Sequence, residues 1–344
     1  MIKISIVIPV YNAVDTIGLC LESLINQTVN KKDYEIIVID NGSDDGSFTI
    51  IKEFVKKHNE NKFILLQELK KGPSEARNRG IKSSSGTFIA FTDSDCVADK
   101  DWLKDIISAF DDEKIGAVAG NIKGYKPRNI IQKLLSITTL KGLKEEKIFD
   151  EFTLTEGGFS TTNLSIRKSL FQELEGFLGE QYGEDHDLCA RVYRKGFKIK
   201  YITNALVYHI HRDTLWGLIV QGFNFGKSHP RNLKKWGKKR LIISLPRYTY
   251  SNKNFIFPIW LDFNPLDKKA IIAIFLGFYN KVFFLFFIVY LVYFFISLKR
   301  QYKKLCIKVS YIEILLSISL LLLKSISMTF GRIYGSYKNK VICI

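Results

Sequence analysis

The stretch Gly86-Thr-Phe-Ile-Ala-Phe-Thr-Asp-Ser-Asp-Cys96 is the part of the chain that indicates its fold class most directly. Its apolar run, Phe88 to Phe91, predicts a buried strand, and the polar triplet Asp93-Ser94-Asp95 follows directly after it. Two carboxylates separated by one residue make an oxygen-only site of the kind that Mg²⁺ and Mn²⁺ prefer, usually shared with substrate phosphates. The spacing is common by itself, so its weight comes from its place in a series of strand-and-loop units.

The segments before this stretch alternate between apolar strands and helices, and the strands are apolar throughout. This pattern predicts an α/β fold with a mostly parallel, Rossmann-like sheet covered on both faces. Ligands of such sheets bind at the carboxyl ends of the strands, where the polar loops of this chain also lie. We therefore expect these loops to converge on one cleft. Strands are predicted at 3–8, 36–39, 63–66 and 88–91, helices at 14–27, 47–58 and from Gly72 onwards, and polar loops at 9–12, 40–46, 71–79 and 93–96.

Length and charge limit the function classes. A chain of 344 residues has room for one large domain with an appendage or for two domains. The net charge of +17 implies an anionic partner, which could be a nucleic acid, a phosphorylated substrate or an acidic lipid surface. Because no nucleic-acid-binding module is recognisable, we expect no nucleic acid partner. Five scattered cysteines without a Cys-x-x-Cys pair, and an N-terminus without signal-peptide features, predict a reduced, cytosolic chain without a zinc site or disulfide framework.

The C-terminal third has a different character. Residues 282–298 carry no charge and residues 309–323 are interrupted only by Glu313, whereas a membrane-spanning helix needs about 20 apolar residues. The linker 299–308 is basic, which argues against placing it across the membrane from a cytosolic domain. A two-span hairpin, a re-entrant or interfacial hairpin and a buried helical pair therefore all stay open. Residues 227–240 carry seven basic side chains, no acidic ones and Trp236, which suits anionic headgroups or the pyrophosphate of a lipid-linked acceptor.

Five motifs in order and spacing make the chain similar to family 2 glycosyltransferases of the GT-A fold (nucleotide-diphospho-sugar transferases). The resemblance covers roughly residues 3–215 and implies transfer of a sugar from a nucleotide-activated donor, with inversion at the anomeric carbon. The motifs are Ser5-Ile-Val-Ile-Pro-Val-Tyr-Asn12, Ile37-Val-Ile-Asp-Asn-Gly-Ser-Asp44, Gly72-Pro-Ser-Glu-Ala-Arg-Asn-Arg-Gly80, Phe91-Thr-Asp-Ser-Asp95 and Gly183-Glu-Asp-His-Asp187.

The resemblance also implies roles for single residues. Many relatives have an aspartate that reads the base at the position of Asn41, so the nucleotide is open, with UDP ahead of dTDP or GDP. Asp95, Asp93 and, as a weaker candidate, His209 would hold Mn²⁺ or Mg²⁺, with His211 and Arg212 as further candidates near the diphosphate. The implied nucleotide-binding residues are Pro9, Val10, Tyr11, Asp40, Asn41, Gly72, Arg77, Asp93 and Ser94.

Inversion in a single displacement needs a base that takes the proton from the attacking hydroxyl. The resemblance assigns this role to Asp185, with Glu184 positioning the acceptor hydroxyl. Asp185 also lies at a predicted helix N-terminus, where aspartate is a preferred cap, so a purely structural role is the alternative. Processive relatives usually carry Gln-x-x-Arg-Trp, which is missing here, and this favours addition of a single sugar.

Together these features predict a hexosyltransferase-type enzyme that acts at the cell membrane with its catalytic domain facing the cytoplasm. Its expected partners are a nucleotide-sugar, a lipid-linked or cell-surface glycan acceptor, and membrane lipids. The alternatives are a sugar nucleotidyltransferase, although the loop 9–12 lacks the glycines and positive charge of that class, and a non-catalytic membrane scaffold. The predicted domains are a catalytic domain at 1–225, a basic interfacial linker at 226–268 and a membrane-associated helical hairpin at 269–344.

Overall fold

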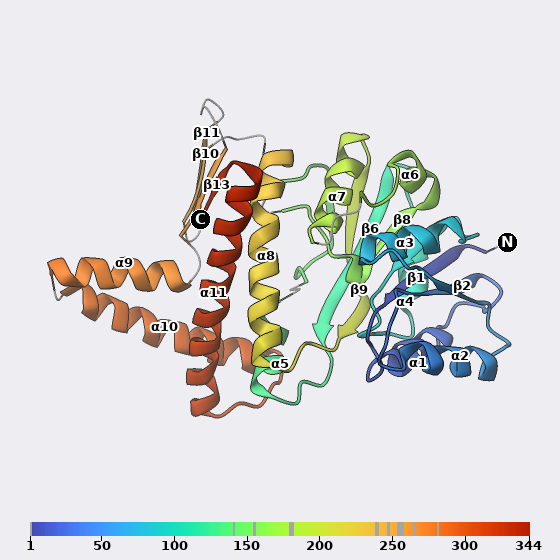
Figure 1. Ribbon diagram of the computed structural model, residues 1–344, viewed down its shortest axis with the longest axis horizontal. Helices are drawn as coiled ribbons and strands as arrows, with labels where there is room; N and C mark the ends of the chain where they lie inside the picture. The colour runs from blue at the N-terminus through green and yellow to red at the C-terminus, as the bar shows by residue number, and fades with distance from the viewer. Residues whose placement is uncertain are drawn as a thin grey trace. The chain divides into compact units, whose positions relative to one another are not determined.

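In a computed structural model, the chain forms two compact units (Figure 1). Unit 1 comprises Met1–Lys126 and Thr139–His211, and unit 2 comprises Pro127–Thr138 and Arg212–Ile344. The structure describes residues 2–139, 142–153, 156–178, 182–237, 241–245, 248–252, 258–263, 266–280 and 282–344.

Unit 1 is a mixed sheet in the order β3-β2-β1-β4-β8-β6-β9-β5, with β7 paired to β9. The first four strands are parallel, as the sequence predicts, and β8 runs antiparallel between β4 and β6. The strands are β1 (Ile4–Val10), β2 (Tyr34–Asp40), β3 (Phe63–Gln67), β4 (Phe88–Phe91), β5 (Cys96–Ala98), β6 (Ile115–Gly124), β7 (Lys147–Phe149), β8 (Leu164–Arg167) and β9 (Lys198–His209).

Helices cover both faces of this sheet because alternate strand residues point to opposite sides. Ile4, Ile6 and Ile8 pack into one apolar cluster with α1 and α4, whereas Val7 packs into the opposite cluster with α3, α6 and α7. The helices of unit 1 are α1 (Ile17–Ile25), α2 (Ser47–Lys57), α3 (Pro73–Lys82), α4 (Trp102–Ala109), α6 (Lys168–Glu173) and α7 (Glu184–Arg194), with a 3₁₀ turn, η1, at Thr161–Asn163.

Strand β1 runs two residues further than the sequence predicts, through Pro9 to Val10. The carbonyl of Lys3 accepts from Phe88 of β4, and the carbonyl of Val10 accepts from Asn41 after β2. Since alternate residues of a parallel strand bond to opposite neighbours, Pro9 faces the β4 side. Pairing with β4 has already ended at Val7, so the missing N–H of Pro9 removes no ladder hydrogen bond.

Unit 2 combines helices with a small four-stranded sheet in the order β11-β10-β12-β13. The segment 226–268, predicted as a basic interfacial linker, includes the last part of α8 and three strands of this sheet. The functional division into three domains stays a prediction. The elements of unit 2 are α5 (Ile130–Thr138), α8 (Leu215–Trp236), β10 (Leu241–Leu245), β11 (Tyr248–Asn252), β12 (Ile259–Asp262), α9 (Leu266–Tyr279), α10 (Val282–Lys304), α11 (Tyr311–Asn339) and β13 (Ile342–Cys343).

Helices α8 and α11 lie side by side and run in the same direction (Figure 1). Glycines four residues apart on each helix, at Gly222 and Gly226 and at Gly331 and Gly335, let the two backbones touch. A Cβ placed on Gly331 would lie 2.0 Å from the carbonyl oxygen of Phe223. Such small residues at four-residue spacing are typical of the closest helix pairs, in membranes and elsewhere.

Among the described residues, one helix is long and apolar enough to cross a membrane, namely α11. Its apolar window has a mean hydropathy of 1.8, and 28% of that window is buried within the structure. Length and composition alone place α11 in this class. The topology of the C-terminal helices therefore stays a prediction.

We predict that Gly331→Ala destabilises unit 2 by about 2 kcal/mol, since the added methyl group meets backbone and not a flexible side chain. Gly18→Ala is the matched control, because the same methyl group at Gly18 meets nothing within 4 Å. Thermal unfolding, with hydrogen exchange of α11 as the local probe, measures both variants. Equal stability of the two variants would contradict the close packing of α8 on α11.

Candidate active site

The loop after β1 presents an aromatic ring to solvent. Pro9 and Val10 are the last residues of β1, and the Tyr11 side chain that follows is 55% exposed. The ammonium group of Lys71 lies 4.4 Å from the centre of the Tyr11 ring. This arrangement offers a flat apolar surface with a positive charge beside it, which is suited to a nucleotide base and its phosphates.

Asp40 is the last residue of β2 and Asn41 follows it, and both are buried. The carboxylate of Asp40 accepts hydrogen bonds from the backbone N–H groups of Gly42 and Ser43, both at 3.3 Å. The amide of Asn41 donates to the carbonyls of Glu68 and Lys70 at 2.7 and 2.9 Å, and its oxygen accepts from Gly72 at 2.7 Å. Asn41 therefore holds the 68–72 loop against the end of β2 with its own side chain.

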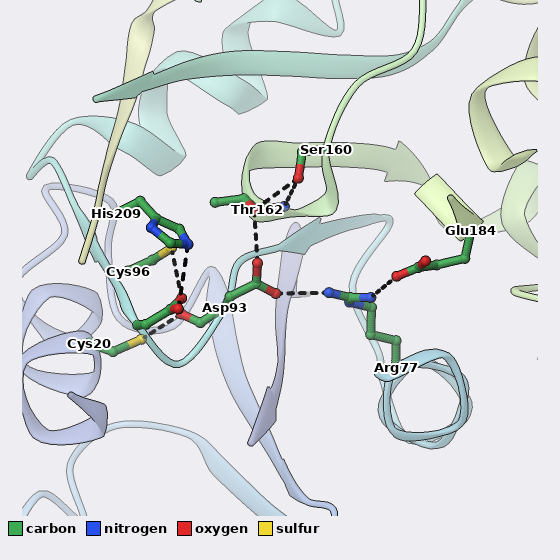
Figure 2. Close-up of polar contacts among 9 residues, drawn as sticks. Cys20, Arg77, Asp93, Cys96, Ser160, Thr162, Glu184 and His209 are labelled. Carbon is green, nitrogen blue, oxygen red and sulfur yellow. Dashed lines mark hydrogen bonds and ion pairs between the residues drawn. The ribbon is translucent and has the colours of Figure 1, made fainter. Parts of the chain in front are cut away.

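Arg77 lies between two carboxylates that are far apart in the sequence (Figure 2). Its side chain is 5% exposed, with Nη2 at 2.8 Å from Asp93 Oδ1 and Nη1 at 3.1 Å from Glu184 Oε1. Burial opposes a charged guanidinium, but Asp93 and Glu184 outweigh that effect and raise the pKa of Arg77, with Asp185 adding to it. Helix α3 supplies this cation, and Gly72 at its N-cap has φ +131°, a value that favours glycine.

The second carboxylate oxygen of Asp93 accepts a hydrogen bond from the hydroxyl of Thr162 at 2.8 Å (Figure 2). Thr162 lies in the 3₁₀ turn before β8, and Ser160 caps that turn. Sequence reasoning did not identify Thr162. Because both oxygens of Asp93 are bonded within the protein, this residue is better placed to orient its loop than to give both oxygens to a cation.

Asp95, Cys96 and His209 form a group that could hold a metal ion, with one ligand atom from each lying within 4.8 Å of the others. His209 Nε2 lies 3.4 Å from Asp95 Oδ2. Partial burial of the Asp95 carboxylate raises its pKa; the charge of His209 opposes this rise, and the charge of Asp93 adds to it. Strands β5 and β9 produce this approach, since Cys96 and His209 are direct partners in the antiparallel register. Sequence reasoning did not identify Cys96.

These residues fit a divalent cation. The Asp95 side chain is 39% exposed, so its oxygens can reach a ligand outside the protein. An imidazole nitrogen and carboxylate oxygens are suitable ligands for Mn²⁺. The Sγ atom of Cys96 donates to Asp95 at 3.7 Å, and burial raises the pKa of this thiol well above its usual range, so Cys96 stays protonated. Ser94 lies between the two aspartates on the same turn and is partly buried.

Helix α7 begins at Glu184, after Gly183 in the left-handed region. Burial, with the nearby charge of Asp185, raises the pKa of Glu184 to about 7, against the opposing effect of Arg77. The Asp185 carboxylate accepts the backbone N–H of His186 at 2.7 Å. Asp187 is paired with Arg191 one turn further on at 2.9 Å, which makes it a structural charge of this helix.

Most of the candidate residues from the sequence therefore belong to one connected set. Arg77 joins the Asp93 loop to the start of α7, and Asp95 lies on the same turn as Asp93. His211 is buried with its ring centre 4.7 Å from that of His209, so it lies behind the metal-ligand group. Arg212 is the first residue of the second segment of unit 2 and is exposed.

Comparison with known proteins now identifies the family. The model for "Glycosyl transferase family 2" matches residues 5–175, which include β1 to β4 and the Asp93 loop. The chain belongs to glycosyl transferase family 2. Its enzyme class is therefore that of a glycosyltransferase, whereas Glu184, Asp185 and His209 lie beyond the matched segment.

The relatives agree with this assignment. Glycosyltransferase AglE of Haloferax volcanii is 29% identical over 77% of this chain and 82% of its own length. The dolichyl N-acetyl-alpha-D-glucosaminyl phosphate 3-beta-D-2,3-diacetamido-2,3-dideoxy-beta-D-glucuronosyltransferase of Methanococcus voltae is 27% identical over 67% of this chain and 74% of its own. Several other curated relatives are longer, and the chain spans 22–63% of their length.

A solved structure shares the GT-A fold. The mannosyltransferase PcManGT from Pyrobaculum calidifontis, solved in complex with GDP-Man and Mn²⁺, superposes with a TM-score of 0.54. The two chains are 18% identical, and the match covers 67% of this chain and 63% of the other. The sequence-based prediction of the fold class is confirmed.

The raised pKa of Glu184 predicts a specific dependence of stability on pH. Between pH 4.5 and about 7 the folded chain holds a proton on Glu184 that the unfolded chain has released, so this residue makes the free energy of unfolding fall as the pH rises. Relative to Glu184→Gln, the wild-type chain should lose about 3 kcal/mol over this window. Urea unfolding at several pH values measures the difference.

The control for this experiment is Glu173→Gln, which removes an exposed carboxylate 3.8 Å from Lys195. Its stability should follow the wild-type curve within a few tenths of a kcal/mol. Parallel pH curves for Glu184→Gln and the wild type would mean that Glu184 titrates normally.

Proposed function

We propose that this enzyme moves a single sugar, with inversion, from a nucleotide-sugar to a lipid-linked or cell-surface glycan acceptor. The observation that carries the proposal is the bridge formed by Arg77, which brings the Asp93–Asp95 turn and the Glu184–Asp185 helix start to one place. A donor diphosphate and an acceptor hydroxyl need to meet between such groups. A UDP-sugar is the favoured donor.

The nucleoside would lie at the ends of β1 and β2. The exposed ring of Tyr11 offers a face for the base, next to the end of β1 at Pro9 and Val10. Because the side chain of Asn41 is bonded to the 68–72 loop, we propose that it shapes the base pocket through Gly72 and does not read the base itself. Asp40, Asp93 and Ser94 are the remaining polar groups proposed for the nucleoside.

A divalent cation, Mn²⁺ or Mg²⁺, would be held by Asp95 and His209, with Asp93 oriented behind them. When bound, this ion neutralises the negative charge that develops on the nucleoside diphosphate as the glycosidic bond breaks. Arg77 is bonded to the carboxylates of Asp93 and Glu184, so its contribution is to hold the Asp93 turn at a fixed distance from α7. The structural relative solved with Mn²⁺ supports the choice of a divalent ion.

Asp185 is the proposed base. It lies at the first turn of α7, where the helix dipole favours the ionised carboxylate. Its neighbour Glu184 is held by Arg77 and, with its pKa raised to about 7, is partly protonated near neutral pH, which limits the negative charge beside the base. Glu184 is therefore proposed to position the acceptor hydroxyl while Asp185 takes its proton.

Membrane lipids and a lipid-linked acceptor are the proposed partners. Unit 2 carries 24 of the lysines and arginines but only four of the aspartates and glutamates, so its net charge is +20, whereas that of unit 1 is −3. Large apolar side chains on α9, α10 and α11 are exposed, Phe278, Val289 and Ile312 among them. Basic charge next to exposed apolar helices suits an anionic membrane surface, with the catalytic unit in the cytoplasm. The name of the Methanococcus voltae relative, which specifies a dolichyl-linked sugar phosphate, supports such an acceptor.

A donor panel with Mn²⁺ or Mg²⁺ tests the reaction class. Release of nucleoside diphosphate supports sugar transfer, whereas release of pyrophosphate would indicate the nucleotidyltransferase alternative. Failure to bind or hydrolyse any donor would favour a non-catalytic role.

Asp185→Asn should lower kcat for sugar transfer by about 10²–10⁴-fold and leave donor binding within a few-fold of the wild type. The loss follows because an amide cannot accept the proton of the attacking hydroxyl. Asp187→Asn is the matched control in the same helical turn, and its activity should stay within a few-fold of the wild type. Unchanged turnover in Asp185→Asn would show that the base is another residue.

Asp95→Asn should weaken activation by Mn²⁺ by at least about tenfold, because one charged oxygen ligand is lost. The measurement is the Mn²⁺ concentration that gives half-maximal activity after treatment with a chelator. Asp111→Asn, which removes an exposed carboxylate paired with Lys200, should leave that concentration unchanged. Full activity of the wild type in excess chelator would argue against a required metal ion.

A further inference from the structure

In the described part of unit 2, two buried cationic side chains have open hydrogen-bond donors. The Lys268 side chain, in the first turn of α9, belongs to a residue that is 8% exposed, and Arg332 on α11 is 2% exposed. Among the described residues, Nζ of Lys268 and Nη1 of Arg332 have no hydrogen-bond partner and are closed off from solvent. Buried donors are nearly always paired, so two such groups in one compact unit require a physical explanation.

The two groups lie on elements that are bonded to each other, because Asp267, beside Lys268 on α9, accepts a hydrogen bond from Thr329, three residues before Arg332 on α11. Burial lowers the pKa of Lys268, and the next largest cause is the positive charge of Arg332. The other nitrogens of Arg332 are bonded, with Nη2 at 2.8 Å from Asp262 Oδ2 and Nε at 3.0 Å from His229 Nδ1. Its guanidinium carbon lies 5.4 Å from the centre of the Trp260 ring. The contacts of the Arg332 guanidinium with Asp262, His229 and Trp260 fix its orientation, and Nη1 is left without a hydrogen-bond partner.

The acidic groups nearby do not pair with these donors. The Asp267 carboxylate accepts hydrogen bonds from the hydroxyls of Ser325 and Thr329, one on each oxygen. Asp262 accepts a hydrogen bond from Nη2 of Arg332 and forms none with Lys268 in the described structure. The negative charges of Asp267 and Asp262 partly offset the lowering of the pKa of Lys268 by burial and by Arg332. Neither carboxylate is bonded to Nζ of Lys268 or Nη1 of Arg332.

We propose that Lys268 and Arg332 form a phosphate-binding site of unit 2, separate from the donor site of unit 1. A phosphate oxygen between the two nitrogens would accept a charge-assisted hydrogen bond from each and remove the cost of burying them unpaired. The first turn of α9 adds the positive end of a helix dipole, which also favours an anion. The +20 charge of the unit attracts anions to this site. The phosphate belongs either to a lipid headgroup or to a free anion, and the proposal does not depend on sugar transfer.

A buried lysine can instead be a purely structural residue that loses its charge. Lys268→Met separates the two roles, because methionine keeps the length and apolar packing of the side chain and removes the nitrogen. If Lys268 only fills space, this variant gains stability and responds to phosphate as the wild type does. If Lys268 binds phosphate, the response to phosphate is lost.

The experiment uses the full chain in neutral detergent, titrated with inorganic phosphate. We expect phosphate to raise the apparent Tm by about 3 °C and to slow hydrogen exchange in the first turn of α9 and around Arg332 on α11. In Lys268→Met the affinity for phosphate should fall by at least about tenfold. Lys269→Met is the matched control. The neighbouring Lys269 donates a hydrogen bond to the hydroxyl of Tyr290 at 3.2 Å, so this variant should leave the response to phosphate unchanged.

Vesicles identify the source of the phosphate. Protection of α9 by phosphatidylglycerol vesicles but not by phosphatidylcholine vesicles assigns an anionic lipid headgroup, and protection by inorganic phosphate alone assigns a free anion. Hydrogen exchange locates the effect in unit 2, so phosphate bound at the donor site of unit 1 cannot be mistaken for it. No protection of α9 by either probe, or equal protection in Lys268→Met, would overturn the proposal whether or not the chain transfers sugar.

Discussion

The candidate active site depends on the buried guanidinium of Arg77. Asp93 and Glu184 come from segments about 90 residues apart, and each carboxylate would be costly to bury beside the other without a cation between them. Arg77 satisfies both with one planar group, at 2.8 and 3.1 Å, and a lysine with its single nitrogen could not span them in the same way. The bridge fixes the distance between the end of β4 and the start of α7, and the proposed reaction depends on that distance because the proposed donor site and the proposed base lie at its two ends.

The parallel half of the sheet could be predicted from the sequence because its strands are continuous apolar runs separated by polar loops. The position of the Asp93–Asp95 turn follows from the same pattern. The hydrogen-bond partners of individual side chains could not be predicted from the sequence. Asn41 is one of the motif residues, but its amide pairs with the backbone of the 68–72 loop, and only the fold reveals that pairing. Thr162 and Cys96 carry no periodic signal, since β8 and β5 bring them to the site through antiparallel pairing with distant strands.

In unit 2, a local charge pattern was insufficient to predict the secondary structure of the basic stretch. The basic stretch 227–240 lies in the predicted linker 226–268, yet most of its residues belong to α8, which runs through Pro230 without ending. The helix is held because α11 packs along it, with glycines on both sides removing the side chains that would separate the two backbones. The glycine spacings were visible in the sequence, but the pairing of two helices about 100 residues apart was not. Basic charge on such a helix is fixed in place, whereas on a free linker it would average over many positions.

The division of charge between the units gives the membrane proposal its physical content. Unit 1 has a net charge of −3, so its overall field does not attract the proposed anionic donor, and local positive charge such as that of Lys71, together with the proposed cation, would have to do so. At physiological salt the Debye length is about 8 Å, and the +20 charge of unit 2 therefore acts mainly on surfaces that touch it. A dense array of anionic headgroups can contact many of these positive charges at once, whereas a single soluble substrate contacts only a few of them. The composition of unit 2 thus favours a surface as its partner, and the buried pair Lys268 and Arg332 marks the place where one phosphate could be bound individually.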